Sequence, residues 1–372
     1  MVSFEINSIE KNFLTSKVDS FLLWLSRFDK RKKIDLIVPV YNFTHELDIL
    51  LSDLKILETV NRVILINDHG FEFDFFDRIE NYKNLIPHKL LIINNKRNLG
   101  FVHAVNNGIL ASDTDSDLLI LNSDALISYK TINRLSLIAT SSGNVGTVSP
   151  LSNSNGFYSF DPSKLLPENK SDLIDVDTVQ TYLSLLSPSL FELSPVNNGF
   201  CLYINRELLS KIGVLDSFIF YRGYGEETDF CLRAAELGFS NLVSLTSFGF
   251  HSAGFSFGNQ KETLKRLNSN RLKSIYPNFI RELASYEKRS IINKLCKHPP
   301  SLLQISLRIN PNKTLPLELI NNELYMNPEL IYFCEPVELI IFLYFKYNIL
   351  IDKNTLELFP VLSKFQSCFD LL

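Results

Sequence analysis

The sequence has few cysteines, and their arrangement excludes two kinds of scaffold. Only five Cys occur in 372 residues, and no two of them form a C-x-x-C pair. A disulfide framework and a zinc site of the usual spacing are therefore not expected, and the pattern favours a reducing compartment. The first residues also lack a basic segment followed by an apolar run, so no signal peptide is expected. We expect a cytoplasmic protein.

Long apolar runs and an excess of positive charge are absent as well. The longest apolar stretch, residues 338–351, contains Lys346 and is too short to span a bilayer. The net charge is −4, which argues against nucleic acid as a partner. The chain is 45% hydrophobic and 21% charged, a composition that fits a globular protein with a sizeable core. Neither a G-x-G-x-x-G fingerprint nor a P-loop occurs, so those two phosphate-binding sites are not expected.

What the sequence does contain is an alternation of apolar runs and helical stretches. The expected strands are residues 33–41, 61–68, 88–95 and 117–124, and the expected helices include 45–57 and 101–112. Because continuous apolar strands alternate with helices, we expect an α/β fold with a Rossmann-like, mostly parallel sheet and helices on both faces. Residues 196–216 predict a further strand and helix, and the chain is expected to be helical from about residue 259.

Polar residues end all four strands. They are Tyr41, Asn42, Asn67, Asp68, Asn94, Asn95, Asn122 and Asp124. Ligands of parallel sheets bind at the carboxyl ends of the strands, so we expect the functional site there. Asp68 can accept hydrogen bonds from a base or ribose, or it can cap a turn, and both interpretations stay open. Asp124 can supply one oxygen ligand to a divalent cation.

Two neighbouring features have competing interpretations. Asp113, Asp115 and Asp117 also show D-x-D spacing, but they precede the fourth strand, at the end of the sheet away from ligands. We interpret them as a solvated turn.

Arg97 and Asn98 enter the helix after the third strand, where a cation, an amide and a helix N-terminus suit an anion or ribose. A capped helix with an unrelated Arg is the alternative.

An acidic cluster begins a predicted helix in residues 223–239, GYGEETDFCLRAAELGF. Asp229 and Arg233 are spaced i, i+4 and can pair, which is a structural role. Glu226 and Glu227 are adjacent, and neighbouring carboxylates raise one another's pKa, which makes them candidate bases. His251 lies in an aromatic, Gly-rich segment and is a packed core residue unless the fold brings it to Asp124.

These motifs resemble the inverting family 2 glycosyltransferases with a GT-A fold, over about residues 34–258. The similar segments are VPVYN (38–42), INDHG (66–70), NLGFVHAVNNG (98–108), LNSDA (121–125), NNGFCLYINRELLSKIGVLD (197–216) followed by GYGEETDFCLRAAELGF (223–239), and FHSAGFSF (250–257). Asn67 stands for the first Asp of the D-D-G-S-like segment, and Asn122 for the first Asp of D-x-D. SPLSNSNGF (149–157) resembles the branch that builds bacterial surface polysaccharides, often as rhamnosyl or related transferases.

The resemblance implies a role for each candidate residue. The implied donor-binding residues are Pro39, Tyr41, Asn42, Asp68, Arg97, Asn98 and Asn122. Asp124, with His251, would hold Mg²⁺ or Mn²⁺ on the diphosphate of a UDP-, dTDP- or GDP-linked sugar. Glu227 aligns with the catalytic base, usually Asp in the family, and Glu226 is the alternative. Asn198, Tyr221 and Tyr224 would lie on the side of a glycan or lipid-linked glycan acceptor.

Other functions stay open beside a metal-dependent inverting transferase. The Asn67 and Asn122 substitutions would also suit a GT-A-like binding or scaffold subunit without activity. A sugar nucleotidyltransferase is disfavoured, because VPVYNFTHEL (38–47) has no Gly for its G-x-G-T-R-like loop.

The division expected for the chain is an N-terminal amphipathic helix in residues 1–33, the GT-A domain in 34–258 and a C-terminal helical region in 259–372. Residues 261–298 carry ten Lys or Arg against three Glu. This basic segment would suit peripheral contact with the inner membrane surface, or it is a solvated helix face.

Overall fold

The computed structural model describes residues 32–68, 75–85, 89–154, 158–162, 175–177, 179–180, 183, 191–252, 261–293, 318–320 and 323–325. The amphipathic helix predicted within residues 1–33 lies outside the described residues, as do residues 69–70, 155–157 and 253–257 of the motifs. Residues 32–179 and 187–298 form one compact unit, which contains the sheet and its flanking helices.

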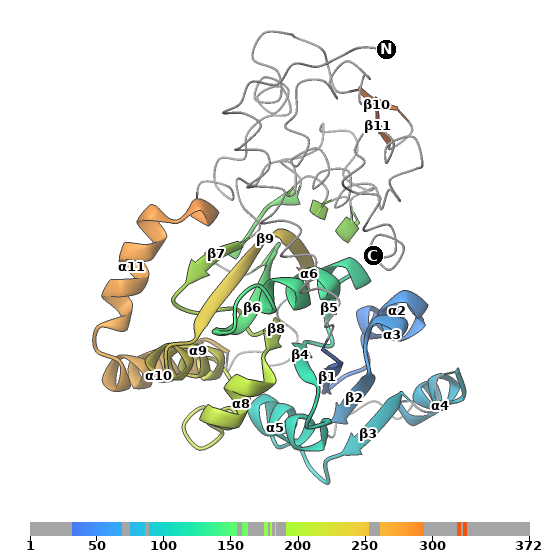
Figure 1. Cartoon of the computed structure of the whole chain (residues 1–372). Coiled ribbons are helices and arrows are strands. Elements are labelled where there is room, and N and C mark those ends of the chain that lie inside the picture. The colour runs from blue at the N-terminus through green and yellow to red at the C-terminus, as the bar shows by residue number, and fades with distance from the viewer. Residues whose placement is uncertain are drawn as a thin grey trace, which may run out of the picture. The chain divides into compact units, whose positions relative to one another are not determined.

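A parallel half-sheet forms the first part of this unit. Its strands are β1 (Ile34–Val40), β2 (Arg62–Asn67), β3 (Leu90–Asn94) and β4 (Asp117–Leu121), in the spatial order β3-β2-β1-β4 (Figure 1). The connecting helices are α2 (His45–Ser52), α3 (Leu54–Thr59), α4 (Phe75–Leu85) and α5 (Phe101–Ala111). The helix predicted over 45–57 is two helices, because the Asp53 side chain accepts from the backbone of Lys55 and Ile56 and starts a new helix.

The second half of the sheet is mixed. Strand β8 (Cys201–Ile204) runs antiparallel to β4 and β6 (Val145–Ser152), and β9 (Ser240–His251) lies parallel to β6. Two short strands, β5 (Ala125–Leu126) and β7 (Phe191–Ser194), pair antiparallel with β9. The helices of this half are α6 (Tyr129–Ala139), α8 (Arg206–Ile212), α9 (Glu226–Glu236), α10 (Lys261–Ile275) and α11 (Phe279–Arg289). The predicted α/β class is confirmed.

Two apolar cores cover the two faces of the sheet. On one face Leu36 and Val38 of β1 pack with buried residues of α2, α3 and α6. On the other face Ile37 packs with α5, α8 and α9, together with Leu272 of α10. Alternate residues of β1 thus point into different cores, which explains its uninterrupted apolar sequence. In α5, Gly108 lets the helix lie close to β1, since a Cβ atom there would lie 2.5 Å from Ile37 Cγ2.

The described residues of the C-terminal region form two helices and two short strands. Helices α10 and α11 agree with the expectation, but residues Glu318–Ile320 (β10) and Glu323–Tyr325 (β11) form an antiparallel ladder. The compact unit also contains α10 and α11, which follow residue 258. The division of the chain into three regions stays a prediction.

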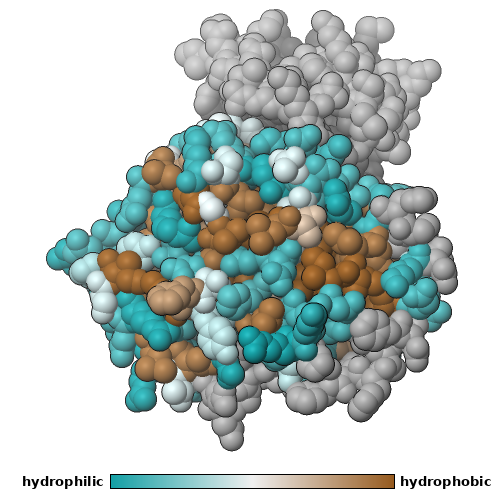
Figure 2. All heavy atoms as spheres, turned by 90° about the horizontal axis from the view of Figure 1, so that it is seen from below, coloured by the Kyte–Doolittle hydropathy of each residue, from teal (hydrophilic) through white to brown (hydrophobic). Residues whose placement is uncertain are grey.

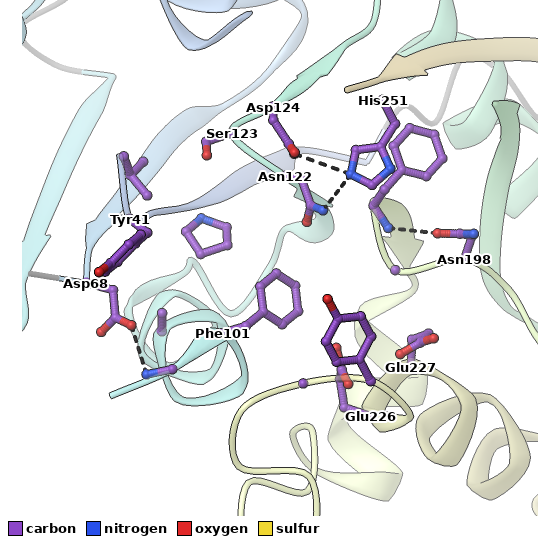
Figure 3. Close-up of a pocket in the computed structure, with 18 of the residues that line it drawn as sticks. Tyr41, Asp68, Phe101, Asn122, Ser123, Asp124, Asn198, Glu226, Glu227 and His251 are labelled. Atoms are coloured by element: carbon purple, nitrogen blue, oxygen red, sulfur yellow. Dashed lines mark hydrogen bonds and ion pairs between the residues drawn. The ribbon is translucent and has the colours of Figure 1, made fainter. Parts of the chain in front are cut away.

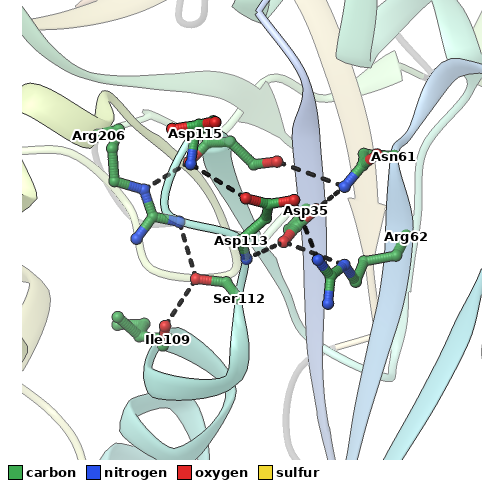
Figure 4. A network of polar contacts seen from close by, with 9 residues as sticks. Asp35, Asn61, Arg62, Ile109, Ser112, Asp113, Asp115 and Arg206 are labelled. Carbon is green, nitrogen blue, oxygen red and sulfur yellow. Dashed lines mark hydrogen bonds and ion pairs between the residues drawn. The ribbon is translucent and has the colours of Figure 1, made fainter.

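A polar network closes the amino end of the parallel strands (Figure 4). Asp35 of β1 is fully buried and accepts hydrogen bonds from Asn61 Nδ2 at 2.8 Å and from Asp113 N at 2.6 Å, and Arg62 Nε lies 3.6 Å away. Asp117 is also buried and accepts from Tyr203 Oη and Arg206 N. The interpretation of the D-x-D-like acids as a solvated turn is therefore wrong for Asp117, because backbone and side-chain donors occupy its carboxylate.

Asp35→Ala is expected to lower the free energy of unfolding by about 3 kcal/mol, because it removes the closest acceptor of the Asn61 amide and the acceptor of the Asp113 N–H, and leaves Arg62 paired with Asp113 alone. Urea unfolding of the full chain measures the change. Asp115→Ala is the matched control, since Asp115 is exposed and only its backbone N–H contacts the network. Equal midpoints for the two variants would contradict the assigned role of Asp35.

Candidate active site

A cavity of about 770 Å³ opens at the carboxyl ends of β1, β2 and β4. Its volume lies within the range of small-molecule sites. Eleven of the predicted site residues line it: Pro39, Tyr41, Asp68, Asn98, Asn122, Asp124, Asn198, Tyr224, Glu226, Glu227 and His251. Figure 3 shows Asp124 and His251 on one side of the cavity and Glu226 and Glu227 on the other. The cavity therefore has two chemically distinct sides.

The first side is a corner made by Asn122, Asp124 and His251. Backbone pairing of β5 with β9 sets Ala125 opposite His251, which places the adjacent Asp124 at the imidazole. His251 Nε2 lies 3.3 Å from Asp124 Oδ1 and 3.2 Å from Asn122 Nδ2, and the ring stacks on Phe200 with centroids 5.2 Å apart. The sequence predicts that His251 is a core residue unless the fold brings it to Asp124, and the fold does so.

The donor atoms of this corner fit a divalent cation. Asn122 Oδ1 and His251 Nδ1 are buried and have no hydrogen-bond partner among the described residues. Carboxylate and amide oxygens are ligands that Mg²⁺ and Mn²⁺ prefer in proteins, and Asp124 and Asn122 supply one of each. His251 faces Asp124 with Nε2 and not with the unpaired Nδ1. Within the described residues no three His, Cys, Asp or Glu side chains converge to hold a metal, so a bound substrate would have to complete the coordination.

Asp68 forms a third part of the wall, and its carboxylate already has partners. Its oxygens accept hydrogen bonds from Asn95 Nδ2, Leu99 N and Gly100 N, each at 2.8 Å (Figure 3). These bonds fix the loop that leads into α5. The turn-capping interpretation of Asp68 is therefore the one the geometry favours, and the residue still faces the cavity.

The second side is the acid pair at the start of α9. Glu226 is only 5% exposed, and Glu227 is partly exposed. Burial, and next the charge of Glu227, hold the pKa of Glu226 well above its ordinary value. Burial also raises the pKa of Glu227, while hydrogen bonds from backbone N–H groups and from Glu226 oppose the rise. Burial and the neighbouring charge thus make Glu226 the member of the pair whose pKa is held highest, and its Oε2 has no hydrogen-bond partner among the described residues.

The remaining acid of the cluster is structural. Asp229 accepts from Arg233 Nε at 2.9 Å and from Tyr276 Oη at 2.8 Å. Arg233 also donates to the carbonyl oxygens of Ile212 and Val214. The predicted i, i+4 pair is present, and it links α9 to the chain after α8, while Tyr276 links it to the end of α10.

Tyr224 also faces the cavity, and its backbone is unusual. It has φ 70°, and it is the only non-Gly residue with positive φ in the described part of the chain. Burial, followed by the charges of Glu226, Glu262, Asp124 and Glu227, raises the pKa of Tyr224 to about 12. The phenol therefore stays protonated and can donate a hydrogen bond into the cavity.

Three predicted residues do not line the cavity. Arg97 is exposed, and Asn42 follows β1 without facing the pocket. Tyr221 is 46% exposed, and its ring makes a T-shaped contact with the ring of His103 instead.

Some residues line the cavity although the sequence patterns did not single them out, among them Phe101, Ser123, Asn153 and Lys265. The side-chain oxygen of Asn153 accepts a hydrogen bond from the backbone N–H of His251 at 2.7 Å, which helps to position the Asn122–Asp124–His251 corner. In the sequence, its loop stands out only for its turn-forming residues.

No protein-family model matches the chain, and the search of curated proteins finds no match. Among solved structures, the chain is similar to the mannosyltransferase PcManGT from Pyrobaculum calidifontis in complex with GDP-Man and Mn²⁺, with a TM-score of 0.47 and 15% identity over 76% of this chain and 81% of that one. A structure of GalNAc-T7 with UDP, GalNAc and Mn²⁺ gives a TM-score of 0.48 and 13% identity over 80% and 68%. Glucosyl-3-phosphoglycerate synthase from Mycobacterium tuberculosis gives 0.44 and 14% over 67% and 82%. Since all three TM-scores lie below 0.5, function has to be inferred from the pocket of this chain.

Proposed function

We propose that the protein is a GT-A-type glycosyltransferase that moves a sugar from a nucleoside-diphosphate donor to a hydroxyl of a glycan or lipid-linked glycan. One observation carries the proposal. The Asp124–His251 corner and the Glu226–Glu227 pair face one cavity at the carboxyl ends of parallel strands. One side suits a cation on a diphosphate, and the other suits a base that needs a raised pKa. The sequence motifs add a resemblance in the same order along the chain.

The donor would lie along the β1–β2–β4 edge. Tyr41, Asp68 and Asn98 offer a ring and polar groups for the nucleoside part, and UDP, dTDP and GDP all remain candidates. Asp124 and His251 would hold Mg²⁺ or Mn²⁺. Such a cation, when bound, neutralises negative charge on the leaving diphosphate.

Glu227 would carry the base function. Its carboxylate accepts the proton of the acceptor hydroxyl as that oxygen attacks the anomeric carbon. The bond from the anomeric carbon to the phosphate oxygen breaks, and the nucleoside diphosphate leaves with the electron pair. Attack from the face opposite the leaving group inverts the anomeric carbon. Glu226, as the protonated partner, would hold the Glu227 carboxylate in place.

A panel of nucleotide sugars with Mn²⁺ tests the proposal. Thermal shift should report binding of at least one donor, and hydrolysis without an acceptor should be slow but metal-dependent. A catalytically inactive binding or scaffold subunit is the second candidate, because only two potential metal ligands of the His, Cys, Asp or Glu types meet in the described part of the pocket. Donor binding without any hydrolysis or transfer would favour that candidate, and no binding at all would contradict both.

The biological setting proposed is bacterial surface polysaccharide synthesis, in the cytoplasm or at the cytoplasmic face of the membrane. Among the described residues, no helix has the length and apolarity needed to cross a bilayer. Figure 2 shows hydrophobic side chains in patches among hydrophilic ones on one face of the molecule. Exposed cations of α10 and α11, such as Arg266, Arg281 and Arg289, would attract anionic lipids. Reversing their charge should abolish flotation with anionic liposomes, and unchanged flotation would contradict this mode of contact.

A further inference from the structure

Helix α10 contributes a residue to the pocket, although it follows the segment that resembles glycosyltransferases. Lys265 lines the cavity, and its Nζ lies 5.7 Å from the centre of the Tyr224 ring. Figure 1 shows α10 beside α9, the helix that begins with the acid pair. The described pocket wall is therefore incomplete without α10.

Three side chains fasten α10 to the loop before α9. Asn268 is 2% exposed and donates from Nδ2 to the carbonyl oxygen of Gly223 at 2.7 Å. Arg271 Nη1 donates to the carbonyl oxygen of Ile219 at 2.7 Å and to Asn268 Oδ1 at 2.8 Å. Leu272 is buried under this loop. The position of Lys265 is thus set by contacts one and two turns further along its own helix.

The loop that α10 fastens has a conformation that needs support. Gly223, Tyr224 and Gly225 have φ values of 106°, 70° and 124°. Left-handed backbone is unfavourable for a tyrosine and persists only where surrounding contacts enforce it. A Cβ atom at Gly225 would lie 3.1 Å from Leu272 Cδ1, so the loop and α10 approach closely. The ring of Tyr224 and the ammonium of Lys265 are therefore held together at the pocket wall.

The charges of the residues that line the pocket indicate a role for Lys265. Its described lining contains four carboxylates, Asp68, Asp124, Glu226 and Glu227, and Lys265 is the one Lys or Arg among these lining residues. A phosphate group that enters such a cavity needs cationic partners. Lys265 now pairs with Glu262 at 3.4 Å, and the two side chains are 46% and 83% exposed. Such an exposed pair contributes little free energy, so an entering phosphate can replace Glu262.

We propose that Lys265 is a phosphate-binding residue of this pocket, held at its wall by the contacts of α10 with residues 219–225. The phosphate belongs either to the diphosphate of the donor or to a phosphorylated acceptor. This inference rests on the proposed function for the identity of the ligand. The chemistry at Lys265, an ammonium donating to phosphate oxygens, is the same in both cases.

Calorimetric titration of the full chain tests the inference with two probes. The first probe is UDP or GDP with Mn²⁺, compared with uridine or guanosine. The second is inorganic phosphate, titrated with and without saturating nucleoside diphosphate. The variants are Lys265→Met, Lys265→Arg and the control Lys273→Met, which removes an exposed cation two turns along the same helix. Thermal unfolding checks that each variant is folded.

Lys265→Met is expected to lower the affinity for the phosphate-bearing probe about tenfold. This corresponds to about 1.4 kcal/mol, the loss of one charge-assisted hydrogen bond. If the variant binds nucleoside diphosphate more weakly but binds the nucleoside with unchanged affinity, Lys265 contacts the donor. If only the affinity for inorganic phosphate falls, Lys265 contacts the phosphate of the acceptor. Lys265→Arg should restore binding, and Lys273→Met should change nothing. Wild-type affinity of Lys265→Met for both probes would overturn the inference. If the wild-type chain binds no nucleoside diphosphate, the proposed function fails, while the phosphate titration still decides the role of Lys265.

Discussion

Glu227→Gln is expected to abolish sugar transfer and to leave nucleoside-diphosphate binding intact. Gln has nearly the same shape as Glu but cannot accept the proton of the acceptor hydroxyl. Loss of a general base typically lowers the rate by about 10²–10⁴. The affinity for the donor should not change, because Glu227 lies across the cavity from Asp124. Transfer assays with the donor identified by the panel, together with calorimetry of UDP or GDP binding, measure both quantities.

Glu226→Gln is the matched control, one residue away on the same helix turn. Gln at 226 can still donate a hydrogen bond to the Glu227 carboxylate, so most of the transfer activity should remain. The opposite pattern, with an active Glu227→Gln and an inactive Glu226→Gln, would reassign the base to Glu226. Activity in both variants would remove the acid pair from the mechanism altogether.

The acid pair also predicts how rate and stability depend on pH. Burial raises the pKa of Glu227, so the base gains its proton, and the rate falls, at a higher pH than for an ordinary carboxyl group. For stability, the folded chain binds the Glu226 proton more tightly than the unfolded chain does. The contribution of Glu226 to stability is therefore greatest below the ordinary Glu pKa and declines as pH rises through the raised one. Glu226→Gln should remove this decline, which denaturant unfolding across a pH series would reveal.

The second large effect is expected at the opposite side of the pocket. Asp124→Ala should weaken Mn²⁺-dependent binding of UDP or GDP at least about 100-fold, because even partners outside the coordination shell contribute 10- to 100-fold to metal affinity. Of the two proposed metal ligands, His251 alone would remain in that corner. Calorimetry with Mn²⁺ and with a chelator separates the metal-dependent part of the affinity.

Asp115→Ala provides the comparison for Asp124→Ala. Asp115 also belongs to a segment with D-x-D spacing, but it lies before β4, at the other end of the sheet. Its removal should leave nucleoside-diphosphate affinity unchanged. Metal-dependent binding by Asp124→Ala at the wild-type level would show that Asp124 is not a metal ligand.

The parallel half of the fold could be predicted because its strands form nearly continuous apolar runs. Strands β1, β2, β3 and β4 all lie within the runs expected from the sequence. The residues just after β1, β2 and β4 line the pocket, because the strand direction fixes where Tyr41, Asp68 and Asp124 emerge. Strand β5 could not be predicted in the same way, because its two residues carry no periodic signal, yet its pairing with β9 positions His251.

The residues that sequence reasoning misplaced depend on side-chain direction or on distant contacts. Arg97 is in the right loop, but Asp68 binds the backbone of Leu99 and Gly100, and the Arg side chain is exposed. In the sequence, Lys265 is only one of ten cations in a basic segment. Its place in the pocket follows from residues of α10 that pack against a loop about fifty residues earlier in the chain.

The attachment of α10 to the loop before α9 also limits how the gene can be shortened. A truncation after residue 258, where the motifs end, would remove Asn268 and Leu272 and leave Tyr224 without the contacts that support its left-handed backbone. It would also expose the apolar residues of α9 that pack on α11, since Phe279 and Cys231 share one cluster. A minimal fragment for crystallisation should therefore retain both α10 and α11.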